Sequence, residues 1–271
     1  MLRDLFGFGR RAPRDDVSIV ICSIDEERFR KVSANYAERM GAGPYEIIRI
    51  GDAKSLAEGY NRGLQKARGD LVIFSHDDIE ILTPDFRARL VAHLQEFDLV
   101  GVAGTSRLLD ARWNSAGQPW VHGQSVQPAR SGKGYVVDIY GQAERLIEPN
   151  AQALDGMFIA ARRAAANALR FDEEHFSAFH LYDMDFSYRA HLARMRVGIA
   201  NDILIYHASL GGFNDSWRHY AAVFQQKFAA MLDKRPAGNP TLHAREPVSS
   251  LEDAVKLFNF YLRECGLAQT A

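Results

Sequence analysis

The stretch that decides the fold reads LVIFSHDD and spans residues 71–78. Its first four residues are all apolar, which predicts a strand that is buried on both faces. Polar residues follow at once, as Ser75, His76, Asp77 and Asp78. Because ligands bind outside the carboxyl ends of the strands in open parallel sheets, we expect these side chains to face a binding crevice.

On both sides of this stretch, apolar strands alternate with amphipathic helices. We predict further strands at residues 17–22, 46–50, 99–103, 197–200 and 203–206, and renewed apolar periodicity at 154–161. Helices are predicted at residues 55–67, around 185–194 and at 251–265, and also after caps at Thr83 and Ser216. Ser55 and Glu58 form a capping box for the first of these helices. This alternation indicates an α/β fold, with a mostly parallel, Rossmann-like sheet flanked by helices.

The region between residues 104 and 149 breaks the pattern. It is rich in Gly, Ser, Gln and Pro, and it contains Trp113, Trp120 and His122. A long segment without strong periodicity inside a compact domain is usually functional or disordered. The two tryptophans argue against disorder, so we expect an ordered excursion on the substrate side of the fold.

The C-terminal part is expected to be an appendage made of a linker and one helix. The linker is marked by Pro236, Gly238, Pro240 and Pro247. The helix at 251–265 carries an apolar stripe of Leu251, Val255, Phe258 and Leu262. That stripe must pack on the main domain or on a second subunit. The second alternative would give a homodimer through the C-terminal helices. We therefore expect an N-terminal extension (1–15), a main domain (16–232) and a linker with a C-terminal helix (233–271).

Charge and cysteine content exclude several classes of protein. Lys and Arg number 33 and Asp and Glu 34, and the net charge of −1 gives no general attraction to nucleic acid. The two cysteines, Cys22 and Cys265, predict neither a disulfide framework nor a zinc knuckle and suit the cytoplasm. No run is long enough to span a bilayer. Residues 1–11 mix apolar residues with arginines, which we interpret as a frayed terminus, the alternative being a weak contact with the inner face of the membrane.

The acidic pair after residue 74 is the first candidate for chemistry. His76, Asp77 and Asp78 would repel and desolvate one another unless a cation compensates, which predicts a metal site. The structural alternative for this segment is a helix cap or a solvated turn.

Two later segments add candidate groups. Asp183 and Asp185 stand at the mouth of a helix, where the dipole favours carboxylates, and either could serve only as a cap. His207 follows an apolar strand and precedes the pair Gly211 and Gly212, which fits a metal ligand as well as a structural histidine. If Asp78 and His207 share an ion, their side chains should lie within about 5 Å of one another, since each ligand sits about 2 Å from the ion.

The order of these motifs resembles the family-two glycosyltransferases with the GT-A fold. It is most similar to the bacterial glycosyltransferase-like branch, in which the Asp-x-Asp motif reads His-x-Asp. The similarity covers residues 17–228 and rests on five short motifs in order, namely His76-x-Asp78, LDGMF at 154–158, FDE at 171–173, His180-x-Tyr182-Asp183-x-Asp185 and His207-x-Ser209. Each motif is weak alone, and their order makes the resemblance specific.

The resemblance implies a metal-dependent transfer of a sugar from a nucleotide diphosphate donor to an acceptor hydroxyl. It implies that Asp78 binds the cation, Mn²⁺ or Mg²⁺, that His207 completes the metal shell with His76 as a further ligand, and that Asp183 is the general base, with Asp185 beside it in the catalytic motif. Imidazole beside a carboxylate suits Mn²⁺ better than Mg²⁺. The residues expected to contact the donor, for which a UDP-sugar is favoured, are Ser23, Asp25, Asp52, Asn61, Asp77, Asp155 and Gly156. With one base and no carboxylate nucleophile on the other face, inversion is expected.

This sequence departs from the family pattern in three places. Cys22 to Glu26 replaces the usual Pro-x-Tyr-Asn turn, Gly51-Asp52-Ala53 replaces Asp-Gly-Ser, and Tyr182 replaces the glutamate before the base. The first two changes affect the site expected for the nucleotide base, whereas the third leaves the general base in place.

For the acceptor and for the location of the protein, we expect only broad classes. The acceptor is a saccharide, a lipid-linked sugar or a protein, as in polysaccharide biosynthesis, and the protein is cytoplasmic or peripheral at the inner face of the membrane. Two rival functions are a nucleotidyl or phosphoryl transferase on the same metal site and a catalytically inactive sugar-binding scaffold. The first would need a glycine-rich phosphate loop or a lysine cradle, and no such loop follows a strand in this sequence.

Overall fold

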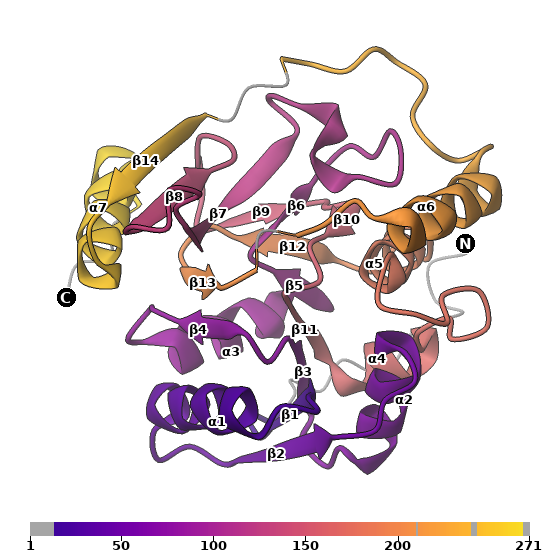
Figure 1. The fold of residues 1–271 in the computed structure, drawn as a ribbon, viewed down its shortest axis with the longest axis horizontal. Coiled ribbons are helices and arrows are strands. Elements are labelled where there is room, and N and C mark those ends of the chain that lie inside the picture. The colour runs from indigo at the N-terminus through magenta and orange to yellow at the C-terminus, as the bar shows by residue number, and fades with distance from the viewer. Residues whose placement is uncertain (1–13, 210, 240–242, 268–271) are drawn as a thin grey trace, which may run out of the picture.

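The computed structural model describes residues 14–209, 211–239 and 243–267 (Figure 1). The segment 1–11, for which membrane contact was the alternative interpretation, and the linker residue Pro240 lie outside the described residues. No helix in the described part of the chain is long and apolar enough to cross a membrane.

A seven-stranded sheet forms the centre of the fold, in the order β2-β1-β3-β11-β5-β12-β9. The bounds of its strands are β1 Val17–Cys22, β2 Tyr45–Ile50, β3 Leu71–Ser75, β5 Leu99–Gly101, β9 Ile147–Pro149, β11 Phe158–Arg162 and β12 Val197–Ala200. All but β11 and β9 run in one direction, since those two pair antiparallel with their neighbours. The predicted α/β class with a mostly parallel sheet is confirmed.

Helices cover both faces of this sheet, because successive residues of a buried strand point to opposite sides. In β1, Ile19 and Ile21 pack with α1 (Glu26–Met40) and α3 (Phe86–Glu96). Val20 points the other way and packs in the core that includes α2, α4, α5 and α6. Figure 1 shows the two helical layers on either side of the sheet. The bounds of the second layer are α2 Leu56–Lys66, α4 Arg163–Leu169, α5 Tyr182–Leu192 and α6 Asp215–Phe228.

The region expected to be an ordered excursion forms part of a second sheet, in the order β10-β6-β7-β13-β4, with β8 paired to β7 and β14 paired to β8. Its strands are β4 Ile79–Ile81, β6 Ala103–Thr105, β7 Val121–Pro128, β8 Tyr135–Ile139, β10 Ala153–Leu154, β13 Ile205–His207 and β14 Ala244–Val248, and a short 3₁₀ helix, η1, spans Trp113–Ala116. The excursion is therefore ordered, as predicted.

The C-terminal helix α7 (Leu251–Glu264) packs on this second sheet. Its predicted stripe meets β7, β8 and β14, with Phe258 and Leu262 buried against Val126 and Val137. The predicted linker contains β14, whose Pro247 is tolerated because, among the described residues, β14 pairs only with β8 and forms an edge. The stripe thus has its partner within the chain, and it gives no argument for a second copy.

Several predicted caps differ from the structure. Ser55 caps α2 as expected. The Glu58 carboxylate, however, accepts a hydrogen bond from the backbone N–H of Lys54 and not from that of Ser55, so the second half of the predicted capping box is not formed. Thr83 caps no helix: α3 starts at Phe86, and the Thr83 hydroxyl accepts the backbone N–H of Leu204 instead.

Two helices also differ from the expectation. Asn214, not Ser216, caps α6. Helix α1 was not predicted, although Asp25 caps it and Val32, Tyr36 and Met40 form its buried stripe.

Candidate functional site

Strand pairing brings Asp78 and His207 together. Asp78 lies between β3 and β4, and His207 is the last residue of β13. Strands β4 and β13 pair antiparallel with Ile79 opposite His207, and the Ala208 N–H donates to the Asp78 carbonyl at 2.9 Å. Two segments that are far apart in the sequence therefore end side by side at the edge of the second sheet.

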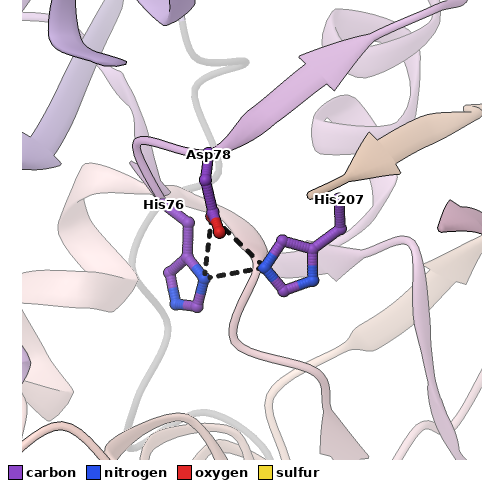
Figure 2. Close-up of side chains that lie close together, drawn as sticks. All are labelled: His76, Asp78 and His207. Carbon is purple, nitrogen blue, oxygen red and sulfur yellow. Dashed lines mark hydrogen bonds and ion pairs between the residues drawn. The ribbon is translucent and has the colours of Figure 1, made fainter. Parts of the chain in front are cut away.

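His76, Asp78 and His207 form a compact cluster (Figure 2). Asp78 Oδ1 lies 3.3 Å from His207 Nε2 and 3.9 Å from His76 Nδ1, and the two ring nitrogens are 3.4 Å apart. The expected separation of Asp78 and His207, within about 5 Å, is confirmed. The candidate ligand atoms all lie within 4.8 Å of one another, so one ion could be bound by all of them at ordinary bond lengths.

The electrostatics of the cluster suit a cation. Burial alone would raise the pKa of Asp78, but the hydrogen bond and charge of His207 outweigh it and lower that pKa to about 2. Burial, reinforced by His207, lowers the pKa of His76 to about 4. Burial also acts to lower the pKa of His207, but its hydrogen bond to Asp78 raises that pKa overall. At neutral pH the cluster therefore offers an ionised carboxylate and a neutral imidazole, the forms that bind metals.

A cavity of about 280 Å³ adjoins the cluster at the carboxyl ends of β1, β2 and β3. It is lined by Cys22, Ser23, Ile24, Ile50, Ala53, Leu56, His76, Asp77, Asp78 and Phe179. A larger cavity of about 430 Å³ lies at the opposite ends of β5 and β12, beside Phe97 and Arg196, and contains none of the predicted site residues. The smaller cavity is the candidate site, because it adjoins the cluster and occupies the place where open α/β sheets bind ligands.

Of the residues expected to contact the donor, Ser23 and Asp77 line this cavity. The Ser23 hydroxyl lies 2.7 Å from Asp77 Oδ2 and 3.0 Å from the Asp25 carbonyl. Ile24 and Phe179 also line it and are exposed, 85% and 54% respectively, and sequence reasoning missed both. The signal that could have identified them is an isolated apolar residue in a loop, since Ile24 follows β1 and Phe179 precedes α5.

Three other residues expected to contact the donor are engaged elsewhere. The Asp25 carboxylate caps α1 by accepting the backbone N–H groups of Glu27 and Arg28. Asp52 is exposed and held by Arg62 at 2.6 and 3.2 Å.

Asn61 is buried, and its side-chain amide bonds both the N–H and the carbonyl of Phe171 at 2.9 Å. None of the side chains of Asp25, Asp52 and Asn61 lines the cavity, and their expected contacts with the donor stay predictions.

Asp183 lies in the first turn of α5, with backbone N–H groups of Met184 and Gly156 near its carboxylate. A side chain at Gly156 would place a Cβ 2.8 Å from Asp183 Oδ2, so only glycine allows this approach. Burial, and then the charge of Asp155, raises the pKa of Asp183 to about 7. A carboxyl poised near neutral pH is suited to accept a proton.

Asp155 links the excursion to the site. Its Oδ2 accepts the indole N–H of Trp113 at 3.0 Å, and its Oδ1 accepts the Met157 N–H at 3.0 Å. Its charge acts on Asp183 and also on His76 and His207. Asp155 is therefore near enough to act electrostatically on both the histidine cluster and Asp183.

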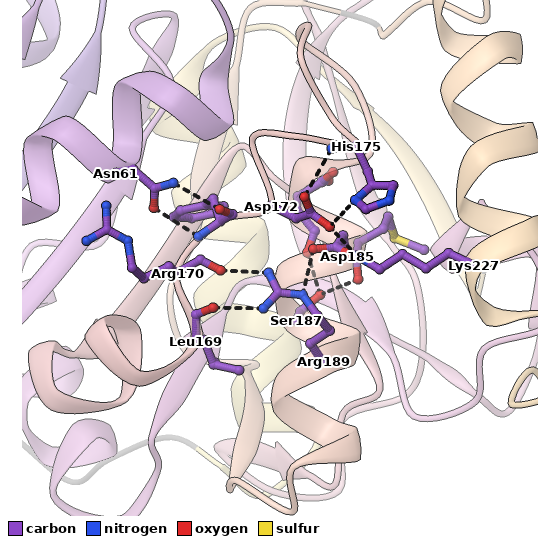
Figure 3. A network of polar contacts seen from close by, with 12 residues as sticks. Asn61, Leu169, Arg170, Asp172, His175, Asp185, Ser187, Arg189 and Lys227 are labelled. Atoms are coloured by element: carbon purple, nitrogen blue, oxygen red, sulfur yellow. Dashed lines mark hydrogen bonds and ion pairs between the residues drawn. The ribbon is translucent and has the colours of Figure 1, made fainter.

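Asp185, which was expected in the catalytic motif, is turned into the protein (Figure 3). It is 0% exposed, and its oxygens accept from Arg189 Nε at 2.8 Å and Lys227 Nζ at 2.6 Å. Lys227 also pairs with Asp172, so the network ties α5 to α6. The position gives Asp185 a structural role, and its expected part in catalysis stays a prediction.

Comparisons with known proteins agree with this architecture. The sequence profile of the glycosyltransferase-like family matches residues 18–228. The mannosyltransferase PcManGT from Pyrobaculum calidifontis, solved with GDP-Man and Mn²⁺, is similar in structure with a TM-score of 0.50 and 13% identity, over 96% of this chain and 79% of that chain. This likeness bears out the predicted GT-A fold.

Two further solved structures are more distant. TarS 1–349 from S. aureus in complex with UDP has a TM-score of 0.44 and 14% identity, over 72% of this chain and 60% of that chain. GalNAc-T7 with UDP, GalNAc and Mn²⁺ has a TM-score of 0.44 and 13% identity, over 77% of this chain and 47% of that chain. The chain thus spans less than two thirds of either protein, and no curated protein matches it in sequence. The profile covers most of the sequence, and the chain belongs to the glycosyltransferase-like family.

Proposed function

We propose that this protein transfers a sugar from a nucleotide diphosphate donor to an acceptor hydroxyl, with a divalent cation held by His76, Asp78 and His207. The observation that supports this most is the cluster itself, in which ligand atoms within 4.8 Å of one another adjoin a cavity at the strand ends. Asp183 supplies the second requirement, a carboxyl with a pKa of about 7 on a neighbouring helix.

The three candidate metal ligands suit a transition-metal ion better than Mg²⁺. Two of the three candidate ligands are imidazoles, which suit Mn²⁺ and other first-row transition metals, whereas Mg²⁺ prefers oxygen ligands. A bound cation would stabilise the negative charge that develops on the departing diphosphate. The chain's own contribution is to hold Asp78 ionised and the ring nitrogens directed at one point.

The cavity lined by Ser23 and Asp77 is the proposed site of the nucleoside. At about 280 Å³ it has room for a nucleobase, and a UDP-sugar is the proposed donor. Ile24 and Phe179 provide apolar contact at its exposed side. Ser23 and Asp77 provide the polar groups that orient the ligand.

Asp183 is the proposed general base. The acceptor hydroxyl loses its proton as it attacks, and a carboxylate within hydrogen-bond reach can receive that proton. Asp155, the neighbouring carboxylate, has one oxygen on the Trp113 indole and the other on a backbone N–H. One free base, with no second free carboxylate beside it in the described part of the chain, supports a single displacement with inversion, which the anomeric configuration of the product would test.

The acceptor is proposed to be a saccharide, a lipid-linked sugar or a protein, in polysaccharide biosynthesis at the cytoplasmic side of the membrane. A nucleotidyl or phosphoryl transferase on the same metal site would instead leave the sugar on a phosphate. A catalytically inactive scaffold would bind the donor and never turn it over. Product analysis by NMR separates these alternatives from sugar transfer.

Thermal unfolding with nucleotide diphosphates, with and without Mn²⁺, is the direct test. A ligand at a hundred times its dissociation constant stabilises the folded state by about 2.7 kcal/mol, which is roughly 5–10 °C in Tm for a chain of this size. We expect UDP with Mn²⁺ to give such a shift, EDTA to abolish it, and GDP to give less. If no nucleotide diphosphate shifts Tm in the presence of Mn²⁺, Mg²⁺ or Fe²⁺, the proposed donor class is wrong.

A further inference from the structure

Tyr182 stands where the family motif has glutamate, and the proposed function gives it no task. It is the first residue of α5, directly after Leu181, whose backbone is in the left-handed region at φ 62°. The Tyr182 side chain is buried, yet its hydroxyl contacts two groups: the Gly156 carbonyl at 3.1 Å and His76 Nε2 at 2.7 Å. It therefore connects the start of the helix that carries Asp183 to a member of the metal cluster.

The direction of these two hydrogen bonds follows from counting protons. A tyrosine hydroxyl has one proton, and a carbonyl can only accept. Within the described residues the Gly156 carbonyl has no other hydrogen-bond donor, and Gly156 is buried. A buried carbonyl left without a donor is costly, so the Tyr182 proton is directed to Gly156. Toward His76 the hydroxyl then presents a lone pair, and Nε2 must carry the proton of that contact.

The opposite side of the His76 ring leads to the same assignment. His207 Nε2 lies 3.3 Å from Asp78 Oδ1 and 2.9 Å from the Ser209 hydroxyl. An ionised carboxylate only accepts, so the hydrogen bond between His207 and Asp78 places a proton on His207 Nε2, and the Ser209 oxygen can accept from the same N–H. His76 Nδ1 faces that nitrogen at 3.4 Å. Two N–H groups directed at one another would repel, so His76 Nδ1 bears a lone pair.

We propose that Tyr182 is a positioning residue that holds His76 in the tautomer protonated at Nε2, so that the Nδ1 lone pair faces Asp78 and His207. In neutral imidazole one nitrogen is a donor and the other an acceptor, and the hydrogen bond on one decides the state of the other. The consequence of this His76 tautomer for cation binding rests on the proposed function, whereas the assignment of the tautomer does not. Tyr182 thereby takes over a task that a carboxylate or a carbonyl performs for many metal-binding histidines.

The tautomer can be measured without any metal. In ¹⁵N NMR spectra of the metal-free protein, we expect His76, identified by its loss in His76→Gln, to be protonated at Nε2. In Tyr182→Phe we expect a mixture of tautomers, because the ring loses the acceptor that is fixed at Nε2. The matched control is Tyr188→Phe on the same helix, whose hydroxyl donates to the Met231 carbonyl away from the site, and which should leave the His76 signals unchanged.

Cation affinity is the second readout. Loss of the partner that orients a metal-binding histidine typically weakens metal binding about 10- to 100-fold, and we expect Tyr182→Phe to do so for Mn²⁺ by calorimetry while Tyr188→Phe does not. A wild-type His76 protonated at Nδ1, or a Tyr182→Phe protein with unchanged tautomer and Mn²⁺ affinity, would overturn the inference. A wild-type protein that binds no Mn²⁺ would instead overturn the proposed metal site, and the wild-type tautomer would then decide on Tyr182 by itself.

Discussion

Replacing Asp183 with asparagine removes the proposed base and almost nothing else. Asparagine has nearly the same size, caps helices about as well as aspartate, and can accept the backbone N–H groups that Met184 and Gly156 direct at this side chain. What it cannot do is accept a proton from the acceptor hydroxyl. Loss of a general base typically costs about 10² to 10⁴ in rate, so we expect kcat to fall by that factor with donor affinity retained.

The same substitution should stabilise the protein, in a way that depends on pH. The pKa of Asp183 rises from 3.8 to about 7 in the folded state because of burial and Asp155. The folded state therefore keeps its proton while the unfolded chain releases it, and this group lowers the stability as pH rises from about 4 to 7. At 1.36 kcal/mol per pKa unit the cost above pH 7 reaches about 4 kcal/mol as an upper limit, since the side chain is partly exposed. Asparagine carries no such cost.

Three measurements check this reasoning together. In EDTA, Asp183→Asn should melt above wild type at pH 8, with the gap narrowing toward pH 4. The wild-type kcat/KM, which reports the free enzyme, should rise roughly tenfold per pH unit below about pH 7 and then level off. Asp215→Asn, a carboxylate in the first turn of α6, is the matched control and should leave turnover unchanged. Turnover near wild type in Asp183→Asn would refute the assignment and make Asp155 the next candidate base.

Other substitutions separate the metal cluster, the fold and the nucleoside site. Asp78→Ala and His207→Ala should each abolish the Mn²⁺-dependent part of the nucleotide shift in Tm, and a full shift in either would remove that residue from the metal site. Asn61→Ala breaks two buried hydrogen bonds to Phe171 and should lower the free energy of unfolding by roughly 2–4 kcal/mol in denaturant titration, with UDP affinity unchanged per folded molecule. Ser23→Ala should weaken UDP binding by about 1 kcal/mol in calorimetry, whereas an unchanged dissociation constant would place the nucleoside elsewhere.

The central sheet could be predicted because its strands are buried on both faces. Such strands must be apolar throughout, as in β1 and β3, and both were located to within a residue. Helix α1 was missed although its signals, the Asp25 cap and the stripe through Val32, Tyr36 and Met40, are present in the sequence. Charged and polar residues fill most of the other positions of this helix, so its apolar periodicity is weak.

Most of the second sheet could not be predicted, and the reason is physical. Strand β7 reads VHGQSVQP and β14 reads AREPV, with neither a continuous apolar run nor clear alternation. Such strands are specified by partners far along the chain, since β8 pairs with both and α7 covers them. The cluster formed by Asp78 and His207 could nevertheless be anticipated, because each residue follows an apolar strand and strand ends converge at a sheet edge.

The spacing of Asp183 and Asp185 in the sequence did not predict which of the two carboxylates faces the site. Asp183 and Asp185 are two residues apart on one helix, and positions two apart point in different directions. In the structure Asp183 lies beside Gly156, whereas Asp185 is enclosed by Arg189 and Lys227. The two carboxylates should therefore respond to the same substitution in opposite ways.

Asp185→Asn should destabilise the protein and leave the chemistry in place. Breaking a buried ion pair costs about 3 kcal/mol or more when the remaining charge loses its partner, which is roughly 6–12 °C in Tm for a chain of this size. Lys227 keeps Asp172 and Arg189 keeps the carbonyls of Leu169 and Arg170, so the loss should be at the lower end of that range. Well below the melting temperature, kcat per folded molecule should stay within a few-fold of wild type. A stable Asp185→Asn protein with turnover as low as that of Asp183→Asn would show that Asp185 acts in the reaction and that its enclosure opens when substrate binds.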